Sequence, residues 1–135
     1  VDFAPIPGRV GQRIRNELDV RSARACPSVL VALHSFTPVY MDERRRWHVG
    51  VLYGRDPRLG RLVREGLRSD GALIVGDNQP YSVSDASDYT IVVHGEHRGI
   101  PHVELEIRQD LLADRQAIET WARRLTAALQ AEQAA

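Results

Sequence analysis

Polar and apolar residues alternate through the segment PHVELEIR at residues 101–108. Its polar face carries two carboxylates, a histidine and an arginine: His102, Glu104, Glu106 and Arg108. Burying such groups on an interior strand is costly unless they are paired or used. Successive residues on one face lie about 6.6 Å apart, so one carboxylate can enter a cleft while its neighbour pairs with an arginine. Glu106 and Glu104 are therefore candidates for general acid–base catalysis.

The same alternation has a second interpretation. An edge strand with a solvated outer face shows the same period of two, and its carboxylates need no partner and no function. Periodicity alone does not separate an interior strand from an edge strand.

His34 directly follows the apolar run SVLVAL at residues 28–33. Ligands of open α/β sheets gather at the carboxyl ends of strands, and a neutral imidazole is a good zinc ligand. We therefore take His34 as a candidate metal ligand, with a structural histidine at a strand end as the alternative. No HExxH segment, cysteine cluster or closely spaced histidine pair completes a metal site in the sequence.

Three consecutive arginines, Arg44 to Arg46, follow in the same region. A guanidinium group matches a carboxylate with two parallel hydrogen bonds, so this run could bind an acidic substrate. The alternative is a solvated loop. The sequence contains no glycine-rich phosphate loop, no Ser/His/Asp motif and no RNA-binding signature.

Short apolar runs alternate with helical periodicity along the chain, which predicts a single α/β domain over residues 1–135. The fold class that we expect is a mixed, largely buried sheet flanked by helices. Strands are predicted at three apolar runs before the VELEI segment: residues 28–33, 47–53 and 72–75.

Helices are predicted where apolar residues recur at helical spacing. Residues 11–25 give a modest amphipathic helix, and Pro57 can begin a second one whose apolar face is formed by Leu59, Leu62, Val63 and Leu67. Asp114 could cap a final helix. Residues 34–46 and 76–89 are expected to be loops with functional residues, and residues 90–98 fit either a strand or a helix.

The charge balance limits the classes of partner. Eighteen basic and eighteen acidic residues cancel, so neither a nucleic acid nor an anionic membrane is an expected partner. The longest apolar run, Val29 to Leu33, is far too short to cross a bilayer. The single cysteine, Cys26, cannot form an intramolecular disulfide, which suits a reducing cytoplasm. We expect Cys26 to be a half-buried structural thiol. The sequence carries no signal for an oligomeric state.

Several long strings resemble the N-formylglutamate amidohydrolase family, in the right order from about Pro27 to Leu125. They are HSFTPV at 34–39, RWHVGVLY at 46–53 followed by RD at 55–56, GDNQPYS at 76–82, DYTIVVHGEHRGIPH at 88–102 and VELEIRQDL at 103–111. The resemblance implies a fold similar to that of the zinc-carboxypeptidase-like hydrolases. It also implies zinc-dependent hydrolysis of a small N-formyl or N-acyl amino acid, with N-formyl-L-glutamate of histidine breakdown as the namesake substrate.

The family's motifs assign roles to individual positions by resemblance. The HS pair after a buried strand matches His34 and Ser35, which makes His34 the metal ligand. The family's late-strand glutamate matches Glu106, with Glu104 as the alternative. Arg46 beside Trp47 is the implied substrate-side residue. Asn78 and Arg108 are further substrate-binding candidates that the resemblance suggests.

One feature of the family has no counterpart in this sequence. Family members are roughly twice as long and begin with an HxG-type segment that is thought to supply further metal ligands. We therefore expect this chain to be the C-terminal portion of the fold, incomplete at its N-terminus. Three interpretations stay open: an active amidohydrolase, a non-catalytic fragment or carboxylate-binding module, and a site completed by residues outside this chain.

Overall fold

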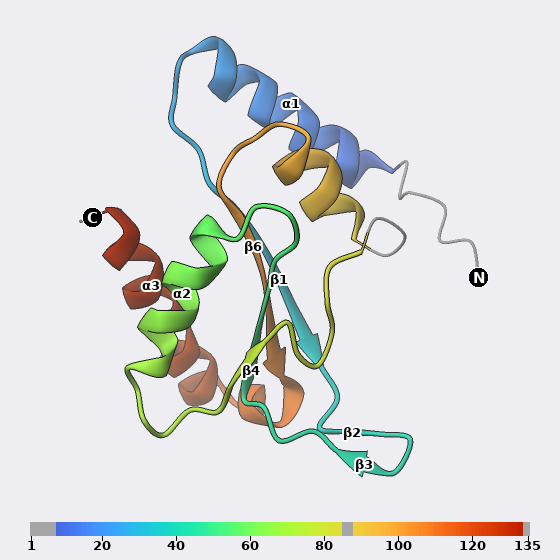
Figure 1. Ribbon diagram of the computed structural model, residues 1–135, viewed down its shortest axis with the longest axis vertical. Helices are drawn as coiled ribbons and strands as arrows, with labels where there is room; N and C mark the ends of the chain where they lie inside the picture. Colours follow the sequence, from blue (N-terminus) through green and yellow to red (C-terminus); the bar gives the residue numbers. More distant parts are fainter. Residues whose placement is uncertain (1–7, 85–87, 134–135) are drawn as a thin grey trace.

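The computed structural model describes residues 8–84 and 88–133 (Figure 1). Helices and strands are interspersed along the chain, with four consecutive strands between the first two helices. In chain order they are α1 (Arg9–Ala23), β1 (Leu30–Phe36), β2 (Val39–Tyr40), β3 (Glu43–Arg44), β4 (Val49–Leu52), α2 (Arg58–Arg68), β5 (Val75–Asp77), the π-helix η1 (Thr90–Glu96), β6 (His102–Arg108), the short 3-10 helix η2 (Gln109–Leu112) and α3 (Arg115–Gln133).

The main sheet has four strands in the order β1-β6-β4-β5. Strand β6 runs parallel to β1 and antiparallel to β4, whereas β4 and β5 are parallel. The VELEI segment is therefore an interior strand between β1 and β4, and the edge-strand alternative is wrong. The mixed α/β class is confirmed.

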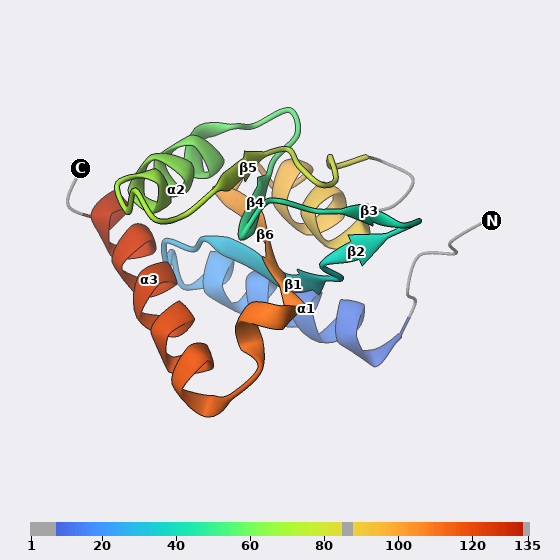
Figure 2. The ribbon, with the colours of Figure 1, turned by 90° about the horizontal axis from the view of Figure 1, so that it is seen from below.

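The two faces of β6 have different surroundings. Its apolar side chains, Val103, Leu105 and Ile107, belong to the main core together with residues of α2 and α3. These two helices lie side by side along one flank of the sheet (Figures 1 and 2). The opposite face carries the polar residues of β6, and η1 contacts β1, β6 and α1 there. The alternation of the sequence thus separates the core from a polar layer.

Both later helices begin as the sequence predicts. Pro57 precedes α2, whose buried face includes Leu59, Val63 and Leu67. Asp114 caps α3, because its Oδ1 accepts a hydrogen bond of 2.8 Å from the backbone N–H of Ala117.

Strand boundaries differ from the prediction at β1 and β5. Strand β1 continues through His34 to Phe36, because its backbone pairs with β6 as far as Arg108. His34 therefore lies within the strand and not after it. Strand β5 begins only at Val75, since residues 70–73 form a turn in which the Leu73 N–H donates to the Asp70 carbonyl.

One segment that was predicted as a loop and one that was left open adopt regular structure. The expected loop at 34–46 contains the hairpin β2–β3, whose tip holds Met41 and Asp42 at positive φ of 48° and 62°. Residues 90–96 form the π-helix η1, which buries Ile91 and Val92. Gly95 allows η1 to approach β6, because a Cβ atom there would lie 2.5 Å from the ring of His102. Among the described residues, no helix has the length and apolar character needed to span a membrane.

Candidate functional site

His34, Glu104 and Glu106 meet on the polar face of the sheet. The register places His34 of β1 directly beside Glu106 of β6. The Nδ1 atom of His34 lies 3.5 Å from Oε1 of Glu104 and 3.7 Å from Oε1 of Glu106. One possible ligand atom from each of the three residues lies within 4.8 Å of the other two. The sequence-predicted histidine and both predicted glutamates are thus brought together.

The two carboxyl groups are buried, whereas the histidine lies at the opening. Glu104 and Glu106 are 4% and 5% exposed, and the side chain of His34 is 53% exposed. Burial disfavours a charged carboxylate, so the two buried carboxyl groups lower the stability of the fold unless a partner compensates them.

Burial also raises the pKa of both carboxyl groups. The pKa of Glu104 rises to about 8, first through desolvation and then through repulsion from Asp88 and Glu106. Desolvation likewise raises the pKa of Glu106, but His34 and Arg45 favour its charged form and oppose the rise. A hydrogen bond between the two carboxyl groups stabilises the charged form of Glu106 and the protonated form of Glu104. Glu104 is therefore the proton carrier of the pair near neutral pH.

The second carboxylate oxygen of Glu106 has an unusual environment. Its Oε2 is buried and has no partner among the described residues. A buried carboxylate oxygen without a partner is unusual in a folded protein and points to a bound cation or water. Together with an imidazole nitrogen and a second carboxylate, it forms a donor set of the kind that zinc accepts.

Asp88 is a site residue that the motifs did not single out. It lies just before η1 and acts on Glu104 both by its charge and by a hydrogen bond. Its Oδ2 also accepts the backbone N–H of Ser84 at 2.7 Å. Its sequence signals were its place in the polar loop 76–89 and at the start of the family-like string 88–102, but the contact with Glu104 depends on the packing of η1 against the sheet.

Two glycines let a loop lie over the site. Gly50 of β4 pairs with Glu106, and a Cβ atom at Gly50 would lie 2.2 Å from the carbonyl oxygen of Gln79. At Gly76 the corresponding distance to the same oxygen is 2.4 Å. The missing side chains therefore allow the loop after β5 to cross the sheet beside Glu106.

The arginine run has members with different surroundings. The guanidinium of Arg45 lies 5.7 Å from the Phe36 ring, 4.7 Å from the Tyr40 ring and 5.0 Å from the Tyr81 ring. Arg46 is exposed, and its guanidinium lies 5.8 Å from the Trp47 ring. Arg45 is thus the member of the run that packs against these rings, whereas the substrate-side role that the resemblance implies for Arg46 stays a prediction.

Asn78 and Arg108, the other predicted substrate-binding residues, hold loops around the site. The Asn78 side-chain oxygen accepts the Tyr53 backbone N–H at 2.9 Å, and Asn78 has a positive φ of 53°. Arg108 donates from Nη1 to three backbone carbonyls, those of Arg45, Arg46 and Trp47, and forms an ion pair with Asp110. A role for either residue in substrate binding stays a prediction.

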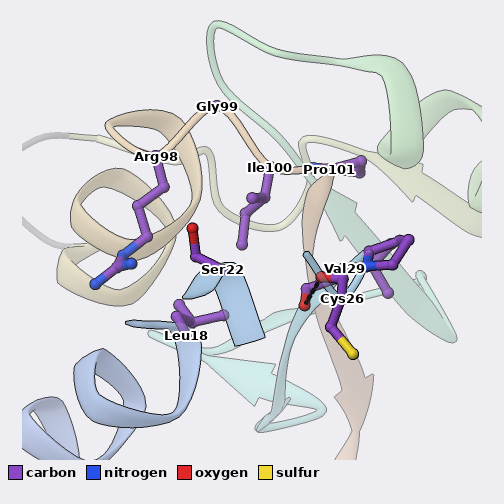
Figure 3. A pocket seen from close by; sticks show the side chains of 10 residues that line it. Leu18, Ser22, Cys26, Val29, Arg98, Gly99, Ile100 and Pro101 are labelled. Carbon is purple, nitrogen blue, oxygen red and sulfur yellow. Dashed lines mark hydrogen bonds between the residues drawn. The ribbon is translucent and has the colours of Figure 1, made fainter. Parts of the chain in front are cut away.

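A cavity lies at the other end of the strands. It has a volume of about 680 Å³ and is lined mainly by Leu18 of α1 and by the segments that precede β1 and β6, including Val29 and Ile100 (Figure 3). Cys26 lines it but is exposed, so the expectation of a half-buried thiol was wrong: β1 begins only at Leu30, which leaves Cys26 in the connection from α1. The cavity holds no cluster of acidic or basic groups and lies apart from His34.

The fold and the cluster define an α/β protein with a histidine–carboxylate site near the carboxyl ends of two parallel strands. The family model for N-formylglutamate amidohydrolase matches residues 11–113. The chain belongs to this family, which confirms the resemblance seen in its motifs.

The chain is similar to a crystal structure of a gene product from Agrobacterium tumefaciens, with 30% identity and a TM-score of 0.81. The match covers 91% of this chain and 50% of that one, so the chain spans about half the length of that relative. No curated protein matches.

Proposed function

We propose that this site hydrolyses the acyl–nitrogen bond of a small N-formyl or N-acyl amino acid in a metal-dependent reaction. The observation that carries the proposal is the convergence of His34, Glu104 and Glu106, in which the buried Oε2 of Glu106 has no partner among the described residues. Membership of the N-formylglutamate amidohydrolase family supports the amide as the bond that is broken.

The residues present fit a zinc ion. Of the three clustered residues, His34 would hold the ion through Nδ1, which leaves Glu106 to act as a base beside it and Glu104 to orient that base. Zinc would supply a Lewis acid that polarises the amide carbonyl and makes water more acidic.

Glu106 is the proposed general base. Burial raises the pKa of Glu106, but His34, the hydrogen bond from Glu104 and Arg45 oppose that rise. Its Oε2, which has no partner among the described residues, is available to water. Glu106 takes a proton from the water whose oxygen bonds to the acyl carbon. It then gives that proton to the departing nitrogen as the carbon–nitrogen bond breaks, which yields a carboxylic acid and a free amine.

Glu104 is proposed to position Glu106. It holds a proton near neutral pH and donates it in the hydrogen bond to Glu106, which orients the base. Asp88 raises the pKa of Glu104 and so helps to keep that proton in place.

Hydrolysis of a panel of N-formyl and N-acyl amino acids, with and without added zinc, tests the proposal. We expect zinc-dependent release of formate or of the acyl acid, with N-formyl-L-glutamate among the substrates. Binding of the same compounds without release, at full zinc occupancy, would support the alternative of a non-catalytic carboxylate-binding module.

A further inference from the structure

We propose that Arg45, held in a cage formed by Phe36, Tyr40 and Tyr81, is the subsite that binds the α-carboxylate of the substrate. The inference rests on the proposed function, because it names how the same site selects N-acyl amino acids over neutral amides.

The cage fixes the guanidinium in one place. Three aromatic rings lie within 5.7 Å of it, and Nη1 donates to the Tyr81 hydroxyl at 2.8 Å and to the Thr37 carbonyl at 3.4 Å. The rings come from three different segments: β1, the β2–β3 hairpin and the loop after β5. Cation–π contacts and the two hydrogen bonds from Nη1 therefore hold the long, flexible side chain of Arg45 in a defined position.

One edge of the guanidinium stays open. Within residues 8–84 and 88–133, no hydrogen bond or ion pair uses Nε or Nη2 of Arg45. These two N–H groups form the edge that binds a carboxylate with two parallel hydrogen bonds. A guanidinium that served only to fasten the hairpin would not need to keep this edge free.

The cage lies next to the reacting groups. Phe36 follows His34 by two residues, so both side chains lie on the same face of β1, about 6.6 Å apart along the strand. Arg45 also affects the charge state of Glu106. In an N-acyl amino acid the acyl carbon and the α-carboxylate carbon are separated by roughly 3–4 Å. A substrate whose amide lies beside Glu106 can therefore place its carboxylate at Arg45.

The other two arginines of the run do not offer this arrangement. Arg44 and Arg46 are exposed, and the one ring contact recorded for them among the described residues is that of Arg46 with Trp47. Arg44 gives a matched control, because it is an exposed arginine of the same run whose side chain makes no ring contact or hydrogen bond with the cage in the described part of the chain.

The test compares N-formyl-L-glutamate with its α-carboxamide, N-formyl-L-isoglutamine, in wild type, Arg45→Gln, Arg45→Lys and Arg44→Gln. Loss of a charge-assisted, two-bond contact should lower kcat/KM for the acid by roughly 10- to 100-fold in Arg45→Gln. The amide should change by no more than about two-fold, because it cannot make that contact. Arg45→Lys should recover part of the loss, and Arg44→Gln should behave as wild type. Circular dichroism checks that each variant is folded.

Binding to the zinc-free protein separates this inference from the proposed function. Calorimetry should show that wild type prefers the acid to the amide, and that Arg45→Gln loses the preference. That result without hydrolysis would contradict the proposed function and leave the subsite standing. Equal losses for acid and amide, or no preference in wild type, would overturn the subsite, since a purely structural arginine predicts those results.

Discussion

Glu106 combines burial, a neighbouring histidine and a free oxygen in one side chain. Desolvation raises the pKa of Glu106, and His34, the hydrogen bond from Glu104 and Arg45 oppose that rise. Two adjacent carboxyl groups with different environments can divide the roles of base and proton carrier. In the proposed reaction Glu106 is the base and Glu104 is the proton carrier.

Replacing Glu106 by glutamine removes the base and keeps the size of the side chain. We expect kcat to fall by about 100-fold or more, since general base catalysis contributes on the order of 10²–10⁴. Formate release is measured at saturating zinc, and zinc content is checked in the same samples. Glu65→Gln, at an exposed position on α2, is the control and should keep wild-type rates. Equal rates in Glu106→Gln and wild type would exclude Glu106 as the base.

Gly50 leaves room for the loop that crosses the site. A Cβ atom at 2.2 Å from the Gln79 carbonyl would push backbone against backbone, so Gly50→Ala should lower the free energy of unfolding by roughly 1–3 kcal/mol. Urea denaturation measures the change. Gly71→Ala is the control, because a Cβ atom there meets nothing within 4 Å. A Gly50→Ala variant as stable as Gly71→Ala would show that the loop does not need this contact.

The strands that carry the site residues were only partly predictable from the sequence. Alternation along PHVELEIR placed Glu104 and Glu106 on one face, and the apolar run before His34 indicated a neighbouring strand end. The pairing of these two strands brings His34 beside Glu106. It depends on the order of strands in the sheet, which neither segment predicts by itself. For the same reason the sequence did not assign Asp88 to the site or single out Arg45 within the arginine run, because the position of each depends on the packing of distant segments.

The π-helix η1 carries a buried histidine with an expected pH effect. His94 is 1% exposed, and neither ring nitrogen has a partner among the described residues. Its ring contacts the edge of Tyr89, while burial together with Arg98 and Arg15 lowers its pKa below the usual 6.5. Below pH 6.5 the unfolded chain therefore takes up a proton that the folded protein resists, so stability falls with falling pH.

The variant His94→Leu should reduce this pH dependence. Between pH 7 and pH 5 its free energy of unfolding is expected to fall less than that of wild type, because the titrating group is gone. Urea denaturation at several pH values measures the slope. His97→Gln, at an exposed position one residue beyond η1, should keep the wild-type slope. A steeper loss in His94→Leu than in wild type would contradict the assignment.

At the scale of the whole molecule, the chain builds a four-stranded mixed sheet with its core on one face and its polar cluster on the other. Length, composition and periodicity sufficed to predict the α/β class, the helices α2 and α3 and the VELEI strand. They did not predict the end of β1, the β2–β3 hairpin or η1, because these depend on pairing and close approach between distant segments. The chain covers half of its Agrobacterium relative, so the activity of the whole protein is a proposal.

Zinc binding by the whole protein tests the central claim most directly. Titration calorimetry of zinc into wild type and His34→Ala asks whether the polar face holds a metal through the predicted ligand, independently of turnover. The account predicts one zinc ion per wild-type chain and loss of that binding in His34→Ala, with zinc at 100 times its Kd stabilising wild type by about 2.7 kcal/mol. No zinc binding by wild type, or equal binding by His34→Ala, would contradict it.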